Sequence, residues 1–294
     1  MEKCRSCPRN CGIDRSLKKG YCGQYDTFRI ARAALHAWEE PCISGTRGSG
    51  TVFFSGCNLG CVFCQNYRVS HRGQGVPVSS DELMEKMLDL QAQGAHNINL
   101  VTPTHFAEQL VPVLAKIKTE LHIPVAYNTG GYETPQTLEM LAPYVDIWMP
   151  DFKFADPEIA RLYAGAPDYP EVAARAIAKM YALTGQVQFD ADGMMTRGVL
   201  VRHLVLPGCK QDSVQVLDKL AEIVPIREIR LSLMSQYTPE FAKDAPYKNL
   251  HRRVTTLEYQ HVMAHAERLG FEGYVQQRES ATSKYTPDFQ GEDM

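Results

Sequence analysis

The stretch SGCNLGCVFCQN, residues 55–66, decides how this chain is interpreted. Its cysteines follow the spacing C-x3-C-x2-C and are Cys57, Cys61 and Cys64. A structural zinc site takes four ligands, a catalytic zinc site takes three and stays open, and a [4Fe–4S] cluster normally takes four cysteines. Three thiolates therefore predict a metal centre with one position free for a substrate or cofactor. The alternative is a closed zinc site whose fourth ligand comes from elsewhere, such as Cys42 or His71.

Composition suggests that these thiols are reduced. The chain has 294 residues and nine cysteines, eight of them in the first 64 residues. A net charge of −3 gives no basic excess for nucleic acid, no apolar run is long enough to cross a bilayer, and the first ten residues contain no apolar signal region. We therefore expect a cytoplasmic protein without nucleic acid or membrane as partner. In such a protein, clustered cysteines bind metal or catalyse rather than form disulfides.

A second cysteine group comes earlier in the chain. It has the spacing C-x2-C-x3-C-x10-C and consists of Cys4, Cys7, Cys11 and Cys22. Four thiolates in a short polar segment can close a zinc site or hold a second iron–sulfur cluster, and spacing does not separate the two. The alternative is that they pack as small hydrophobic side chains. Cys209 follows a strand candidate, which leaves a role in the site open for it.

Beyond residue 50 the sequence alternates apolar runs with amphipathic stretches. The strand candidates are TVFFSG (51–56), NINLVT (97–102), IPVAYNT (123–129), VDIWMP (145–150), GVLVRHLVLP (198–207) and IREIRLSLM (226–234). The helix candidates are 80–93, 106–120, 134–142, 171–184, 212–223 and 255–268. Apolar strands alternating with helices predict an α/β fold with a parallel (β/α) sheet, open or curled into a barrel, whose chemistry lies at the C-terminal strand ends.

This pattern divides the chain into three expected parts. Residues 1–50 do not share the alternation and are expected to be a cysteine-rich N-terminal segment. Residues 51–285 are expected to form the β/α core, and residues 286–294 a flexible tail. At the predicted start of the helix at 80–93, Ser79 and Glu82 fit a capping box. Gly94 is expected to stop this helix, whose apolar face would consist of Leu83, Met84, Met87 and Leu88.

The cysteine motif resembles that of the radical S-adenosylmethionine (SAM) enzymes. It follows the first strand candidate, and an aromatic residue, Phe63, precedes its last cysteine. The resemblance implies a partial (β/α)6 barrel and a [4Fe–4S] cluster held by the three cysteines, whose fourth iron is chelated by the amino and carboxylate groups of SAM. It also implies reductive cleavage of SAM to a 5′-deoxyadenosyl radical that abstracts hydrogen.

Further segments are similar to pyruvate formate-lyase activating enzymes, in particular the PflX-type subgroup. They are CVFCQN (61–66), MPDFKF (149–154), VRHLVLPGC (201–209) and LSLMSQYTPE (231–240), with the N-terminal cysteine segment. The resemblance implies SAM contacts by Asp151 and Lys153, with Gln236 or Tyr237 facing the adenosine. It also implies a low-potential flavodoxin or ferredoxin as electron donor and makes a protein substrate, such as a glycyl-radical enzyme, one candidate.

Two other strand ends supply candidate SAM contacts. Thr102 and its neighbours in NLVTPTHF (99–106) offer hydroxyl and carbonyl acceptors for an ammonium group. Asn128 precedes two glycines, which allow a ligand to approach the backbone closely, although an ordinary turn explains them equally well. Lys153 could instead be an exposed lysine paired with Asp151 or Asp156. His105 is interpreted as a packing residue at a helix start rather than a base.

A rival interpretation comes from another class of protein. The chain could be a cysteine-rich zinc-binding or iron–sulfur electron-transfer module without SAM chemistry. A ferredoxin run has the spacing C-x2-C-x2-C-x3-C-P, which neither cysteine group shows. A binding module also does not need the long β/α scaffold. The sequence therefore favours an enzyme of the radical SAM type.

Overall fold

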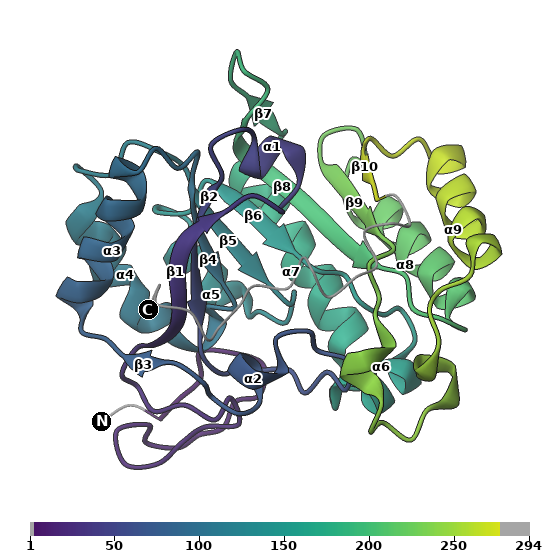
Figure 1. Ribbon diagram of the computed structural model, residues 1–294, viewed down its shortest axis with the longest axis horizontal. Coiled ribbons are helices and arrows are strands. Elements are labelled where there is room, and N and C mark those ends of the chain that lie inside the picture. The colour runs from purple at the N-terminus through teal and green to yellow at the C-terminus, as the bar shows by residue number, and fades with distance from the viewer. Residues whose placement is uncertain (1–2, 277–294) are drawn as a thin grey trace.

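The computed structural model describes residues 3–276 and is built around one curved sheet (Figure 1). Its strands follow the order β10-β9-β8-β6-β5-β4-β2-β1-β3, and β7 pairs with β8. The strands are β1 (Arg29–His36), β2 (Ser49–Phe54), β3 (Val76–Pro77), β4 (Ile98–Val101), β5 (Val125–Thr129), β6 (Ile147–Pro150), β7 (Gln188–Phe189), β8 (Met195–Leu204), β9 (Arg230–Met234) and β10 (Gly273–Val275). From β2 to β10 along this order, every neighbouring pair is parallel. This confirms the predicted α/β fold class.

The helices alternate with the strands along the chain. They are α1 (Pro41–Ser44), α2 (Tyr67–Ser70), α3 (Ser80–Ala92), α4 (Ala107–Ile117), α5 (Pro135–Leu141), α6 (Pro157–Ala164), α7 (Tyr169–Thr184), α8 (Lys210–Ile223) and α9 (Thr256–Leu269). Three 3-10 helices span Thr104–Phe106, Pro239–Ala242 and Lys248–His251. No helix within residues 3–276 is both long and apolar enough to cross a bilayer.

All six predicted strands and all six predicted helices are present, with small shifts at their ends. Each of β2, β4, β5 and β6 is buried along its whole length, which explains the unbroken apolar runs in the sequence. The capping box of Ser79 and Glu82 is formed, and Gly94 has a positive φ of 91°. The predicted apolar face of α3 is wrong at one position, because Leu88 is half-buried and Leu90 is buried instead. Leu90 lies one turn after Met87 on the core-facing side.

Alternate residues of each strand face two different layers. Val52, Leu100 and Tyr127 belong to the large apolar cluster between the sheet and the helices. On the concave side of the sheet, Ala126 and Met149 pack in a second cluster with other strand residues and with α1. The short helix α1 therefore fills part of the concave interior of the partial barrel. The rest of that interior stays open toward the C-terminal strand ends.

The N-terminal segment joins this framework in two ways. Residues 29–36, which the sequence did not suggest as a strand, form β1 and pair antiparallel with β2. The residues before β1 contain no regular helix or strand and are fixed mainly by side-chain contacts to the core. The division at residue 50 stays a prediction. The predicted tail, 286–294, lies outside the described residues.

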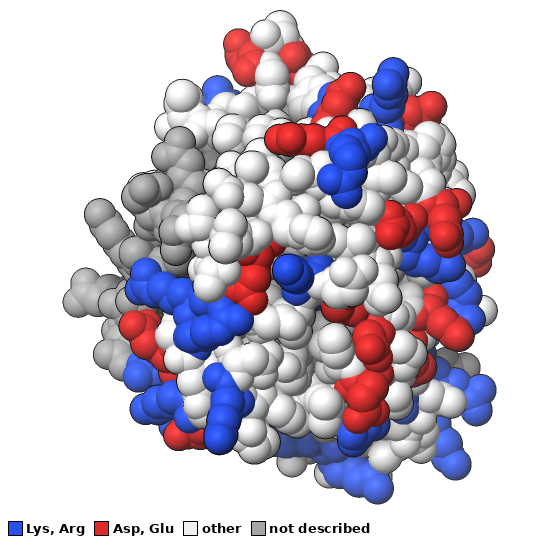
Figure 2. All heavy atoms as spheres, turned by 90° about the vertical axis from the view of Figure 1, so that its right-hand side faces the viewer, with Lys and Arg blue, Asp and Glu red and all other residues white. Residues whose placement is uncertain are grey.

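Surface charge is unevenly distributed. The face formed largely by α8 and α9 carries basic and acidic side chains interspersed with one another (Figure 2). Several of these charges are paired, for example Lys219 with Glu222 and Arg252 with Glu258. Exposed pairs of this kind contribute little to stability, so this face is best described as a solvated surface.

Candidate active site

A cavity of about 240 Å³ opens at the C-terminal ends of the parallel strands. Eight residues proposed from the sequence line it together: Cys57, Cys61, Cys64, Thr102, Asn128, Asp151, Lys153 and Gln236. They come from the segments that follow β2, β4, β6 and β9 and from the end of β5. Parallel strands bring their C-terminal ends to one edge, which is why residues distant in sequence meet here.

The cysteine loop is tied to its surroundings by backbone hydrogen bonds. Gly60 N–H donates to Ala164 O at 3.1 Å, and Val62 N–H donates to Tyr163 O at 2.9 Å, so the loop is bound to the last turn of α6. Gly56 has a φ of 86°, and a Cβ there would lie 2.5 Å from Cys22 O. Only glycine fits at this close approach of the loop to the N-terminal segment.

The three thiols of the loop are half-buried beside the cavity. Burial raises the pKa of Cys61 to about 12 and also raises the pKa of Cys57 and Cys64. Leu59 N–H donates to Cys57 Sγ at 3.3 Å, and Ser70 Oγ lies 3.2 Å from Cys64 Sγ. Buried thiols ionise only when a cation compensates for lost hydration, and a coordinated metal supplies that compensation.

Four ionisable side chains form the wall beside the cysteines. Lys153 Nζ lies 2.5 Å from Asp151 Oδ2, and Arg202 Nε donates to Asp151 Oδ1 at 3.1 Å. Arg202 also reaches Glu39 Oε2 at 3.1 Å and Asn128 Oδ1 at 2.7 Å. The side chains of Lys153 and Asp151 are only 19% and 15% exposed, so these ion pairs are largely shielded from water.

The ionisation of this group follows from burial and pairing. Burial alone would raise the pKa of Asp151, but Lys153 and Arg202 outweigh it and the pKa is lowered. For Lys153 burial favours the neutral amine, yet Asp151 overcomes this and raises the pKa. Burial raises the pKa of Glu39 despite the nearby Arg202 guanidinium. The wall thus presents a charged lysine and a charged arginine on either side of Asp151.

The polar groups at the other strand ends are held in defined positions. Thr102 has a φ of 57°, a left-handed conformation that is rare for a β-branched residue, and its N–H donates to Asn128 O at 2.8 Å. Backbone strain of this kind concentrates at functional sites. Gln65 Nε2 donates to Gln236 O at 3.2 Å, which links the segment after β9 to the cysteine loop. Tyr237 is buried and bonds to Leu250 O, so of the two predicted alternatives Gln236 is the one that faces the cavity.

Other sequence candidates lie outside the cavity. Cys42 packs in the concave apolar cluster with α1, and Cys209 is buried at the start of α8, where burial raises its pKa to about 11. His71 lines a separate surface groove. Cys42 is therefore not placed as a fourth ligand to the cysteine loop, whereas His71, whose Nδ1 lies 2.8 Å from the Ser70 hydroxyl beside Cys64, stays an alternative. His105 is buried, lies 2.7 Å from Ser55 O and has a pKa lowered to about 3 by burial, which agrees with its interpretation as a packing residue.

Sequence reasoning missed three residues of the site. Arg202 sits within a strand, where a charged side chain requires partners, and this was the available signal. Glu39 comes from the loop after β1 and left no recognisable pattern. The Tyr169 hydroxyl accepts from Lys153 N–H at 2.9 Å and lies within hydrogen-bond distance of the carbonyls of Gly130 and Asp151. It thereby ties the end of β5 to the end of β6.

The N-terminal cysteines lie near one another beside the core. The sulfurs of Cys11 and Cys22 are 3.9 and 3.4 Å from the point where a Cβ of Gly20 would lie. Cys7 and Cys22 are buried, and burial raises the pKa of both thiols. Across residues 3–276, no three His, Cys, Asp or Glu side chains are grouped so as to hold one metal ion, and this applies to both cysteine groups.

The N-terminal segment is joined to the cysteine loop through Arg9. Its guanidinium donates to Asn58 O at 2.8 Å, to Gly165 O at 2.6 Å and to Ala164 O at 3.3 Å. The same group lies 3.9 Å from the ring centre of Tyr21. Because Arg9 stands between Cys7 and Cys11 in the sequence, it connects the two cysteine regions directly.

Comparison with known proteins identifies the class. The family description of the Radical SAM superfamily matches residues 51–221, more than half of the chain, and the chain belongs to this superfamily. The uncharacterized protein MJ0674 of Methanocaldococcus jannaschii is 26% identical over 281 residues, which cover 91% of this chain and 75% of that protein.

Solved structures share the fold. SuiB of Streptococcus suis bound to its precursor peptide SuiA matches with a TM-score of 0.53 and 12% identity over 75% of this chain and 46% of SuiB. A radical SAM methyltransferase from Sphaerobacter thermophilus matches with a TM-score of 0.53 and 15% identity over 78% of this chain and 66% of the enzyme. The chain thus spans about half the length of SuiB and two thirds of the methyltransferase.

The superfamily implies SAM and a [4Fe–4S] cluster, and the residues present fit both. The donor set is three sulfurs on one loop, which suits iron–sulfur ligation and leaves one iron without a cysteine. Beside these sulfurs the cavity offers a lysine, an arginine, carboxylates and an amide, which match the mixed charges of an amino acid head group.

Proposed function

We propose that the chain is a radical SAM enzyme whose [4Fe–4S] cluster is held by Cys57, Cys61 and Cys64. When bound, the cluster and SAM supply reductive cleavage of SAM to methionine and a 5′-deoxyadenosyl radical, which removes a hydrogen atom from a substrate. The observation that carries the proposal is that the three cysteines share one cavity with the polar residues from the other strand ends. The rival, a cysteine-rich module without SAM chemistry, gives no reason for this convergence.

The side chains of the wall have separate roles in this proposal. Lys153, a charged donor beside the cysteines, binds oxygen atoms of SAM on its carboxylate or ribose side, away from the sulfonium charge. Asp151 and Arg202 hold Lys153 in place, and Asp151 limits the net charge that the sulfonium meets. Thr102 and Asn128 offer acceptors for the ammonium group, and Gln236 faces the adenosine.

A second part of the proposal concerns Cys4, Cys7, Cys11 and Cys22. We propose that they hold a separate zinc ion or iron–sulfur cluster, which draws their sulfurs together. The closeness of the Cys11 and Cys22 sulfurs to one point supports this. Such a centre would be structural, because four thiolates leave no position for a substrate.

The substrate and the donor belong to the same proposal. The resemblance to activating enzymes makes a glycyl-radical enzyme the first protein substrate to test, and a low-potential flavodoxin or ferredoxin the first donor. SuiB, a structural neighbour, was solved with a precursor peptide, which keeps peptides in view as a substrate class.

The test is an anaerobic assay of the reconstituted protein. With dithionite as reductant and SAM as co-substrate, we expect 5′-deoxyadenosine and methionine to form, together with the brown colour of an iron–sulfur protein that oxygen bleaches. A colourless protein that carries zinc on the 57–64 loop and forms no 5′-deoxyadenosine would reject the proposal. Adding a glycyl-radical enzyme then tests the finer claim, because its activation should depend on SAM.

A further inference from the structure

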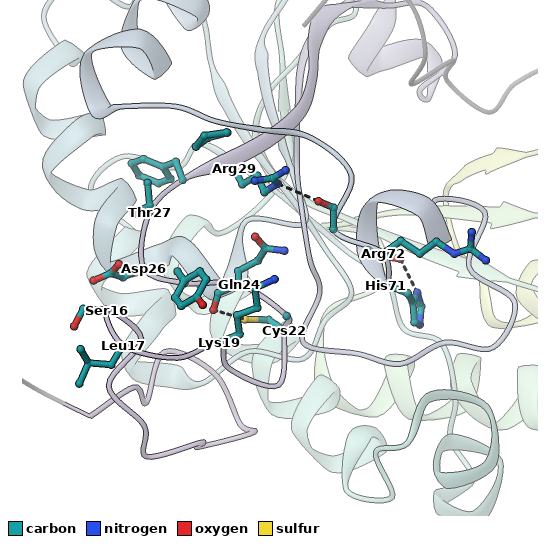
Figure 3. A pocket seen from close by; sticks show the side chains of 16 residues that line it. Ser16, Leu17, Lys19, Cys22, Gln24, Asp26, Thr27, Arg29, His71 and Arg72 are labelled. Atoms are coloured by element: carbon teal, nitrogen blue, oxygen red, sulfur yellow. Dashed lines mark hydrogen bonds between the residues drawn. The ribbon is translucent and has the colours of Figure 1, made fainter.

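A second hollow lies beside the cysteine loop, on the outer side of the active site. It has a volume of about 830 Å³ and lies between residues 16–29 of the N-terminal segment and the residues around α2 (Figure 3). Lys19 and Cys22 stand on one wall, and His71 and Arg72 on the other. We call this hollow the basic groove and define it by its lining lysine and arginines, Lys19, Arg29 and Arg72, which outnumber its one lining aspartate, Asp26.

The charge of the basic groove is opposite to that of the whole chain. Its lining holds three lysines and arginines and one aspartate, while the chain as a whole has a net charge of −3. Arg68 and then Arg72 lower the pKa of the nearby, half-buried Tyr67, with a further contribution from Lys243. The face with α8 and α9 differs, since its charges of both signs are interspersed (Figure 2). The basic groove is therefore a region of positive potential next to the cysteines.

The groove also lies close to the proposed cluster. Ser70 lines both the groove and the active-site cavity. Its hydroxyl lies 3.2 Å from Cys64 Sγ and 2.8 Å from Nδ1 of the exposed His71. On the opposite wall, the carbonyl oxygen of Cys22 lies against Gly56, the residue before Cys57. Two hydrogen-bonded contacts thus separate the surface of the groove from a cluster ligand.

We propose that the basic groove docks an acidic protein that donates single electrons to the cluster. This rests on the proposed function, because an electron entry is useful only if the cluster is present. One electron leaves the reduced prosthetic group of the donor and reduces the cluster, and no bond forms between the proteins. Electron transfer weakens steeply with distance, so the short contact through Ser70 favours this face for entry.

The physical character of the groove fits such a partner. Redox encounters between proteins use small interfaces and are driven by complementary charge, which speeds association without tight binding. Nucleic acid would also be attracted to the cations, but contact with a cluster ligand gives it no advantage. The groove is therefore assigned to an acidic electron donor, and nucleic acid becomes an outcome of the test.

The experiment compares two double variants with equal changes in charge. The first is Lys19→Glu with Arg72→Glu, which reverses two exposed cations of the groove. The control is Arg175→Glu with Arg227→Glu, which reverses two exposed cations that do not line it. Each protein is checked for iron content and melting temperature. Formation of 5′-deoxyadenosine is then measured with dithionite and, separately, with reduced flavodoxin.

We expect the groove variant to match wild type with dithionite but to need at least about tenfold more flavodoxin for half-maximal rate. The flavodoxin-driven rate of wild type and of the control should fall with added salt, because salt screens exposed charges. Equal flavodoxin requirements in both double variants would overturn the docking proposal alone. No product from wild type with dithionite would overturn the proposed function and this proposal with it. Single-stranded RNA that binds wild type more tightly than flavodoxin does, and is lost in the groove variant, would assign the groove to nucleic acid.

Discussion

The two cysteine regions of this chain occupy different physical settings. Cys57, Cys61 and Cys64 lie on a loop at the strand ends, beside a cavity and a wall of paired charges. The earlier four cysteines lie in a segment without regular secondary structure, held against the core by the side chains of Arg9 and Arg15. The first setting joins three thiols to a cavity lined by polar residues, whereas in the second Cys7 and Cys22 are buried and Cys4 and Cys11 are half-buried. Under the proposed function, the same residue type would serve an open, reactive centre in one place and a closed, structural one in the other.

The largest expected effect separates the two regions directly. Cys61→Ala should remove the iron of the catalytic cluster and abolish formation of 5′-deoxyadenosine, because the remaining two thiolates cannot hold a cluster that needs three. Cys11→Ala should remove only the N-terminal metal and leave a measurable SAM cleavage rate. Iron and zinc analysis of both variants, with the cleavage assay, checks this. Unchanged iron in Cys61→Ala, or total loss of activity in Cys11→Ala with its catalytic iron intact, would break the comparison.

The next effect compares two buried carboxyl groups. Asp151 is surrounded by cations, whereas Glu133, near Cys7, accepts hydrogen bonds from the hydroxyls of Thr104 and Thr129, and burial raises its pKa to about 7. Because the pKa of Glu133 is raised in the fold, its contribution to the free energy of unfolding is fully present below about pH 4.5. This contribution is lost as the pH rises through about 7. On this shift the buried charge costs about 3 kcal/mol above pH 7.

The variant Glu133→Gln removes this ionisation while keeping the shape of the side chain. We expect it to be more stable than wild type at pH 8 and close to wild type at pH 5. Denaturant unfolding at the two pH values provides the measurement. A stability difference between the two proteins that does not change with pH would contradict the assignment of Glu133 as a neutral acid in the fold.

A smaller effect is expected for Lys153, which lines the active-site cavity. A charge-assisted hydrogen bond is worth about 1.5–3 kcal/mol, so Lys153→Ala should weaken SAM binding about ten- to a hundredfold while leaving cluster iron intact. Lys153→Arg should not restore it fully, because the planar guanidinium needs a different geometry. The matched control is Lys179→Ala, since Lys179 pairs with Glu139 at the same 2.5 Å but lies away from the cavity. Anaerobic calorimetry that finds equal SAM affinity in both alanine variants would exclude Lys153 from the SAM site.

The smallest expected effect concerns the connection between the regions. Arg9→Ala removes three hydrogen bonds to backbone carbonyls, and partial exposure limits the cost to about 1–2 kcal/mol. We also expect faster loss of catalytic iron to a chelator, because Asn58 lies within the cysteine loop. Arg5→Ala, at an exposed position of the same segment, is the control. Identical iron loss in both variants would show that the two regions are independent.

Much of this architecture could be predicted from the sequence because it depends on local patterns. The alternation of apolar strands and amphipathic helices gave all six strand–helix units, since burial on both faces leaves a continuous apolar run. Strand β1 was missed because its run, RIARAALH, contains two arginines and no continuous apolar stretch. Its antiparallel pairing with β2 depends on a partner strand rather than on its own pattern.

The sequence by itself determined the cysteine spacings, the order of the elements and the strand ends on which Asp151, Lys153 and Asn128 lie. Only the tertiary structure decided that Arg202 meets Glu39, 163 residues away, and that Arg9 reaches the cysteine loop. The physical reason is one of range. Hydrophobic periodicity records which face of an element is buried, whereas an ion pair or a hydrogen bond between distant segments exists only after the sheet has brought the strand ends together.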